Sequence, residues 1–130
     1  MREIKFRAWD KNDQMMYEVS EMVYSQMGID WKAKGDHALE SWRGDADFMQ
    51  YTGLKDKNGK EIYEGDLLAW ENDGERDLYK VIYEAPSFKY THLKNPEFIG
   101  ATKAFDELES LDFEVIGNIY ENCTVCLAIC

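Results

Sequence analysis

The sequence predicts a small all-β, mainly antiparallel fold, a sheet or small barrel of hairpins capped by one α-helix near residues 102–110. Apolar runs rich in β-branched and aromatic residues alternate with Asn-Gly and Asp-Gly turn signals, a pattern typical of hairpins. A single segment has a helical pattern, so the helix–strand alternation of a parallel sheet is absent.

The amino-terminal residues 4–9 alternate in polarity with a period of two, which predicts a half-buried strand. A turn follows at residues 10–13, with Asp13 in the left-handed position that favours Gly, Asn or Asp. Residues 15–19 then form the return strand, which brings Trp9 near Met15, and residues 22–24 continue it or begin another strand. We expect three side chains of the first strand to point inward: Ile4, Phe6 and Ala8.

Residues 26–47 have no clear period, and three glycines interrupt them. We expect a long irregular excursion with one short strand or helix, for which Ala38–Trp42 is the candidate helical turn.

Residues 50–70 give the strongest local signal, which is strand, turn, strand, turn, strand. A two-residue loop at Asn58-Gly59 would place two lysines opposite each other. A type I turn that starts at Asp56, with Gly59 left-handed, pairs a base with an acid instead. The spacing does not fit a calcium loop. We therefore expect these cross-strand pairs: Lys55 with Glu61, and Leu54 with Ile62.

A second turn at residues 64–66 leads to a strand at residues 67–71, and a turn at residues 72–75 leads to the strongly β segment 78–83. Residues 88–91 are expected to form a short edge strand. One face of the strand at 78–83 carries Tyr79, Val81 and Tyr83.

The helix is predicted at residues 102–110, where Thr102 can cap the first turn and acids follow it. Residues 113–120 form a β-run with a bulge at Gly117-Asn118. Residues 125–129 would close the sheet.

The length of 130 residues and a hydrophobic content of 45% predict a single packed domain, residues 1–130. No apolar run has the length of a signal peptide core or a membrane span. We expect a soluble intracellular, cytoplasmic protein without membrane contact. The net charge of −11 makes direct nucleic-acid binding unfavourable.

Candidate sites for chemistry are few. The apolar tail at residues 123–130 holds three cysteines, and one C-x-x-C supplies only half of a zinc site, so inert thiols are the simplest interpretation. His37 and His92 lie far away. The acids Glu61, Glu64 and Asp66 occupy turn positions and are expected to be solvated. We predict no catalytic, cofactor-binding or metal-binding residues. The cysteines of the tail are Cys123, Cys126 and Cys130.

Three sequence blocks resemble the YopX family of phage and prophage proteins: IKFRAWDKNDQMMYEV, QYTGLKDKNGKEIYEGDLL and EVIGNIYEN. The resemblance implies an all-β pseudobarrel with a helical cap, encoded by a phage or prophage and working inside a bacterial cell. It supplies no catalytic residues. The chain departs from the family pattern in its cysteine-rich tail, and residues 26–47 match no motif.

These observations favour a non-enzymatic binding or regulatory module that acts on a protein partner or on its own copies. Exposed aromatic side chains would be its anchors, and the tail at residues 125–129 could pair with the sheet edge of another copy. The alternatives are an acidic DNA mimic that inhibits a host nucleic-acid-binding protein, and an enzyme whose site is assembled from distant residues. The candidate anchors are Tyr63, Trp70 and Tyr120.

Overall fold

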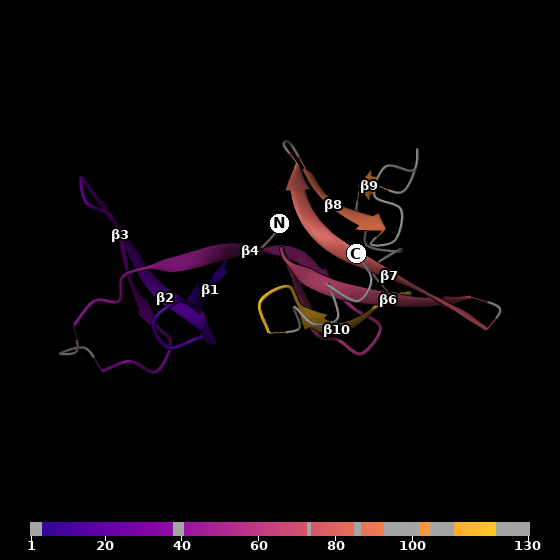
Figure 1. Ribbon diagram of the computed structural model, residues 1–130, viewed down its shortest axis with the longest axis horizontal. Helices are drawn as coiled ribbons and strands as arrows, with labels where there is room; N and C mark the ends of the chain where they lie inside the picture. Colours follow the sequence, from indigo (N-terminus) through magenta and orange to yellow (C-terminus); the bar gives the residue numbers. More distant parts are fainter. Residues whose placement is uncertain are drawn as a thin grey trace. The chain divides into compact units, whose positions relative to one another are not determined.

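The computed structural model describes residues 4–37, 41–72, 74–84, 87–92, 102–104 and 111–121 (Figure 1). Its elements are ten β-strands, and every pair of neighbouring strands is antiparallel. The all-β, antiparallel prediction is therefore confirmed. The chain divides into two compact units, Ile4–Gln50 and a second unit that contains Tyr51–Cys130.

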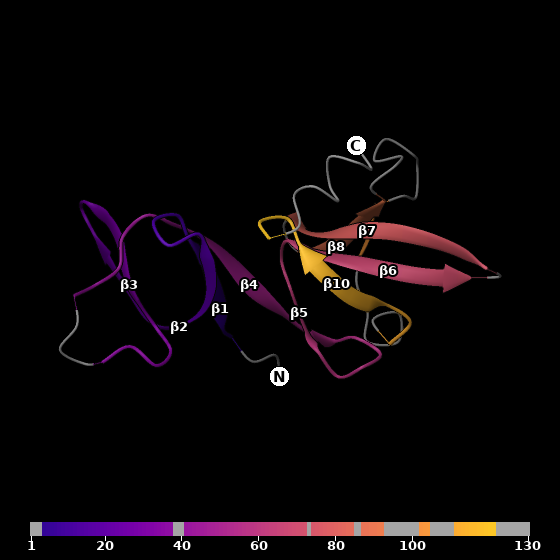
Figure 2. The same cartoon turned by 60° about the horizontal axis from the view of Figure 1, so that its bottom comes forward.

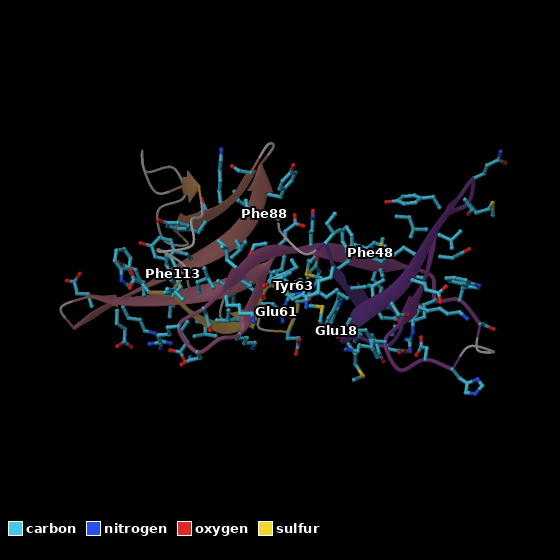
Figure 3. The ribbon with its side chains drawn as sticks, turned by 180° about the vertical axis from the view of Figure 1, so that it is seen from behind. Glu18, Phe48, Glu61, Tyr63, Phe88 and Phe113 are labelled. Atoms are coloured by element: carbon cyan, nitrogen blue, oxygen red, sulfur yellow. The ribbon has the colours of Figure 1, made fainter. Side chains whose placement is uncertain are left out.

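The first unit is a sheet in the order β3-β2-β1-β4. Its core contains the buried residues Ala8, Trp31 and Ala33, against which Phe48 and other half-buried side chains pack. Phe48 meets the Trp31 ring edge-on at 5.9 Å between centroids, and Figure 3 labels it in this unit. The strands are β1 Phe6–Asp10, β2 Met15–Ser25, β3 Gly28–Ala33 and the first half of β4 Ala46–Lys55.

The second half of β4 pairs with β5 Glu61–Tyr63 in the second unit. The preferred turn is confirmed, because Lys55 lies opposite Glu61 and Gly59 has φ 80°. The predicted pair Leu54–Ile62 is wrong. Residues 52–54 together stand opposite Ile62, and the Thr52 hydroxyl donates to the Ile62 carbonyl at 2.7 Å. This bulge follows from a side-chain hydrogen bond that strand periodicity does not reveal.

The second sheet has the order β10-β6-β7-β8-β9. Figure 2 shows β10 beside β6, although a long stretch of chain separates them in sequence. Its core combines aliphatic and aromatic side chains, and the ring centroid of Phe113, labelled in Figure 3, lies 5.5 Å from that of Tyr79 and 5.0 Å from that of Tyr90. The strands are β6 Asp66–Asn72, β7 Glu75–Glu84, β8 Ser87–His92, β9 Thr102–Ala104 and β10 Glu114–Asn118.

The prediction of a helix at residues 102–110 is wrong for the part of this segment that the structure describes. Thr102–Ala104 is strand β9, and residues 105–110 lie outside the described residues. β9 pairs with β8 through Thr91 and Thr102, so tertiary pairing overrides a weak local helix signal. For the same reason β8 is not an edge strand. The described strands form two open sheets and no closed barrel, so the pseudobarrel is not supported among them.

The first turn is one residue longer than expected. Gln14, not Asp13, has the left-handed conformation with φ 58°, because Asp10 accepts N–H groups across the turn and its carbonyl accepts the N–H of Gln14. Trp9 consequently lies opposite Met16. Ala8 is buried as predicted, but Ile4 is 73% exposed because the strand begins only at Phe6.

The predictions for the remaining turns and strands are confirmed only in part. The turns at residues 64–66 and 72–75 join β5 to β6 and β6 to β7 as expected. Tyr79 and Val81 are buried, whereas Tyr83, predicted on the same face, is 48% exposed. The ladder of β10 shifts between Val115 and Gly117, slightly before the predicted bulge. The segment predicted to close the sheet, residues 125–129, lies outside the described residues.

Candidate interaction site on the β2–β3 hairpin

In its described residues, the irregular excursion predicted for residues 26–47 contains strand β3 and the start of β4 at Ala46, and β3 forms a hairpin with β2. A two-residue turn at Gln26-Met27 joins the strands, and Gly28 has φ 121°, a conformation that side chains rarely adopt. The Ser25 hydroxyl accepts the N–H of Met27 at 3.2 Å. Turn hydrogen bonds and a glycine thus fix the hairpin at its end.

This hairpin extends past the rest of its sheet. β1 pairs with β2 only through residues 15–18, so residues 19–25 of β2 and 28–33 of β3 form a two-stranded ribbon. Figure 1 shows the indigo hairpin continuing beyond the end of β1. Two strands alone are marginally stable in water, so the ribbon depends on how its root is held.

The ribbon changes from buried to exposed along its length. At the root, Trp31 and Ala33 are buried. At the far end, Val23 is 47%, Tyr24 is 78% and Met27 is 97% exposed, and we call these three residues the apolar tip. Val23 and Tyr24 are neighbours in β2 and point to opposite faces, so large apolar side chains are exposed on both faces of the ribbon's far end, where they are available to contact another molecule.

An ion network holds the root of the ribbon. The Arg43 backbone pairs with Trp31, and its guanidinium donates to Asp36 at 2.8 and 3.1 Å, to Asp10 at 2.9 Å and to Asp13 at 3.0 Å. The same guanidinium lies over the Tyr17 ring, 4.3 Å from its centroid. Within the described residues, the oxygens that Arg43 contacts belong to its own unit, so the network has a structural role and fixes the segment after β3.

The network stays charged at neutral pH. Hydrogen bonds from Arg43 and from the Ala33 N–H lower the pKa of Asp36 to about 2. The Tyr17 hydroxyl and then Arg43 lower the pKa of Asp13. The hydrogen bonds to Asp36 raise the pKa of Arg43 further above its ordinary value. These charged groups of the network therefore all stay ionised at physiological pH.

The anchor residues proposed from the sequence lie in the second unit. Tyr63 is buried and stacks near Tyr51 at 5.5 Å between centroids, so it is a core residue. Tyr120 is half-buried. Trp70 is 36% exposed, with its ring 5.9 Å from Phe113, and of the three it remains a surface candidate. Sequence reasoning missed the apolar tip, whose signal was an unbroken β-prone run followed by a Gly turn.

The interpretation of the turn acids as solvated is wrong for Asp66. This side chain is buried, and its Oδ2 accepts the Tyr63 N–H at 2.8 Å, which closes the turn between β5 and β6. Glu61 and Glu64 are half-buried, and Figure 3 labels Glu61 on β5. His37 is exposed. The cysteines of the tail lie outside the described residues, as does the side chain of His92.

The described part of the chain shows neither a metal-binding cluster nor a helix that could span a membrane. No group of three or more His, Cys, Asp or Glu side chains there is arranged to hold a metal ion. No helix there is long and apolar enough to cross a membrane.

The chain is similar to a known protein family and to a solved structure. The family described as "YopX protein" matches residues 5–125. A crystal structure of protein EF1440 from Enterococcus faecalis is similar, with 29% sequence identity and a TM-score of 0.69. The similarity covers 97% of this chain and 99% of that one. No match to a curated protein is found. The resemblance inferred from the sequence is confirmed.

Proposed function

This chain belongs to the YopX family, and we propose that it is a small non-enzymatic binding module that acts through protein–protein contacts inside a bacterial cell. The apolar tip is the observation that supports this proposal. Tyrosine and other large side chains dominate the energetics of protein interfaces because they bury much surface at low entropic cost. Here such side chains are held away from the sheet on a ribbon with a fixed root.

The experiment is a capture of proteins from a bacterial lysate by the full-length chain, at low and at high salt. The tip variant carries the double substitution Tyr24→Ser and Met27→Ser, which removes the two most exposed side chains of the apolar tip. The control is Leu111→Ser, which removes an apolar side chain that is 54% exposed in the other unit. Apolar contacts are insensitive to salt. We expect a specific protein that persists at high salt, is retained by the control and is lost with the tip.

Sedimentation velocity of the same variants tests self-association. A larger species that disappears only in the tip variant would identify a second copy as the partner. A variant chain without residues 123–130 tests the separate prediction that the tail joins copies. A chain that stays monomeric and captures no protein in a tip-dependent manner would contradict the proposal.

A second candidate is an acidic mimic of DNA, which the net charge of −11 favours. Part of this charge is used internally, because Asp10, Asp36, Asp56 and Asp66 accept hydrogen bonds from their own chain. The surface available for mimicry is thereby reduced. A host nucleic-acid-binding protein that is lost at high salt, and that binds the tip variant normally, would support the mimic instead.

A further inference from the structure

The two edges of the ribbon differ in what covers their backbone groups. At the root of the β3 edge, Trp31 donates to the Arg43 carbonyl at 3.2 Å and accepts the Arg43 N–H at 2.7 Å. On the β2 edge, β1 stops pairing at Glu18, and none of the strands in the described ranges pairs with this edge beyond it. The outer part of the β2 edge is therefore open, and an open edge is a template for pairing with another strand.

The register of the hairpin determines which backbone groups of this edge point outward. In an antiparallel pair, residues directly opposite each other point their backbone groups both toward the partner strand or both away from it. Trp31 points away, toward Arg43, so Met22 opposite it points away on the β2 edge. Tyr24 lies two residues further and points the same way, whereas Val23 between them bonds within the ribbon. The edge thus offers its outward donors and acceptors symmetrically about Val23.

This arrangement of outward groups is self-complementary. When a second copy of β2 lies antiparallel to the first, with a two-fold axis at Val23, Met22 of each copy stands opposite Tyr24 of the other. Each Met22–Tyr24 pair then exchanges two N–H···O=C bonds, because both residues point outward. The two Val23 residues face each other at the axis as a non-hydrogen-bonded pair, the kind in which side chains approach most closely.

The exposed side chains of the ribbon also match those of a second copy. Val23 is 47% and Tyr24 is 78% exposed, and they point to opposite faces. A partner docked on one face would leave the other face uncovered, whereas an added strand lies beside both. In the two-fold pairing, Val23 packs against its own copy on one face. On the opposite face, Tyr24 packs against the half-buried Met22 of the second copy.

The charge of the ribbon permits this contact although the chain as a whole carries −11. Residues 19–33 hold two acids and one base, so the ribbon carries −1 of that charge. The base, Lys32, lies directly opposite Glu21 within the ribbon. In the two-fold pairing, Glu21 stands opposite Ser25 of the second copy. Strand spacings place the acids of different copies about 12 Å or more apart, beyond the Debye length of about 8 Å at physiological salt.

We propose that two copies of this chain pair through their β2 edges, antiparallel and in the register centred on Val23, to form a four-stranded ribbon. Two strands alone are marginally stable in water, whereas a wider sheet with packed side chains is stable. The pairing therefore covers Val23 and Tyr24 and also strengthens the hairpin that carries them. This inference rests on the proposed function, since it names a second copy of the chain as the partner that the hairpin binds.

The test is sedimentation equilibrium of the full-length chain under reducing conditions, which keep the cysteines of the tail from cross-linking two copies. A small interface gives weak association, so the chain is studied up to about 1 mM. We expect a monomer–dimer equilibrium in this range. In a mixture of isotope-labelled and unlabelled chains, we expect NOE contacts between Met22 of one copy and Tyr24 of the other.

A charge exchange at Val23 tests the register, because only a two-fold axis at this residue places it opposite itself. Val23→Lys and Val23→Glu each bring like charges directly opposite each other, so each variant alone should dimerise about 10-fold more weakly. An equal mixture of the two variants brings opposite charges together and should recover the dimer. Within its own ribbon, Val23→Lys faces Asp30, so the hairpin of this variant keeps a favourable pair.

Asp30→Lys is the matched control. It introduces the same charge on the same face of the ribbon, but one strand further from the second copy. This control should dimerise like the unmodified chain, and the NMR spectra of all variants should show the native fold.

A chain that stays monomeric up to about 1 mM, a dimer that Val23→Lys leaves unchanged, or a mixture that associates no better than its components would each overturn the inference. The proposed function is judged separately by the capture from a lysate. If a monomeric chain captures a protein in a tip-dependent manner, the binding module stands and the two-fold pairing is wrong.

Discussion

Asp56 provides the sharpest test of how the second unit is held together. This buried carboxylate accepts the N–H groups of Asn58 at 2.8 Å and Lys60 at 2.9 Å through Oδ1. Its Oδ2 accepts the N–H of Val115 at 2.9 Å, from a strand far away in sequence. One side chain therefore closes the central hairpin turn and also ties that turn to β10.

Asp56→Ala removes the acceptor of all three bonds, and Asp56→Asn keeps one oxygen. Asn58 and Lys60 are exposed, so water replaces part of each lost bond, at a cost of about 1 kcal/mol each. The half-buried Val115 N–H is left without an acceptor, at a cost of about 2 kcal/mol. We expect Asp56→Ala to lower the free energy of unfolding by about 4 kcal/mol, and Asp56→Asn by about 2 kcal/mol.

Urea denaturation at neutral pH measures these losses, and hydrogen exchange of the Val115 amide locates them. The asparagine variant should keep the turn protected while the Val115 amide exchanges faster. Equal losses for the two variants, or a loss below about 1 kcal/mol for the alanine variant, would refute the assignment of a double role to this carboxylate.

Three further predictions follow from local geometry. Gly59→Ala should lower the free energy of unfolding by about 1 kcal/mol, because Gly59 has φ 80°, whereas an added Cβ meets no atom within 4 Å. The control Gly44→Ala lies at a position without positive φ and should leave stability unchanged. Equal urea midpoints for the two variants would contradict this prediction. Because Arg43 lowers the pKa of Asp36 from 3.8 to about 2, the stabilisation is complete above pH 3.8 and is lost as the pH falls toward 2. The Trp31 indole NMR signal should report that loss, and an unchanged acid profile in Arg43→Met would count against the network. Burial raises the pKa of Tyr79, so the folded state favours the neutral phenol and stability should fall as the pH rises above 10. In alkaline urea titrations, Tyr79→Phe should reduce this loss of stability with pH. An unchanged dependence on pH would show that Tyr79 is not its cause.

The sequence predicts correctly those turns and hairpins whose conformation is set by their own residues. The turn at Asp56–Lys60 is specified by its own residues, since Gly59 tolerates the left-handed conformation and Asp56 bonds the turn N–H groups. The hairpin of β6 and β7 is likewise specified by Gly74 and by β-prone runs. The parts that failed depend on distant partners, and β9 is an example, because its pairing with β8 outweighs a helix-like local pattern.

The candidate site was harder to predict from the sequence than the fold, because it depends more on tertiary contacts. The residues Met22–Tyr24 were correctly placed on a strand, but no local pattern shows where β1 stops covering that strand. Trp31 became a core residue and Arg43 its neighbour only when the excursion folded back on β3. Exposure of Tyr24 and burial of Tyr63 are therefore outcomes of packing, although both residues lie in similar β-prone runs.

The sequence by itself determined the family, the antiparallel β class and the principal turns, because turn residues and period-two patterns act over a few neighbouring residues. Only the tertiary structure decided which strands are neighbours, which acids are internal and which sheet edge is open. These features depend on contacts between residues tens of positions apart, such as Arg43 with Asp10 and Asp56 with Val115, and such contacts leave no periodic trace in the chain.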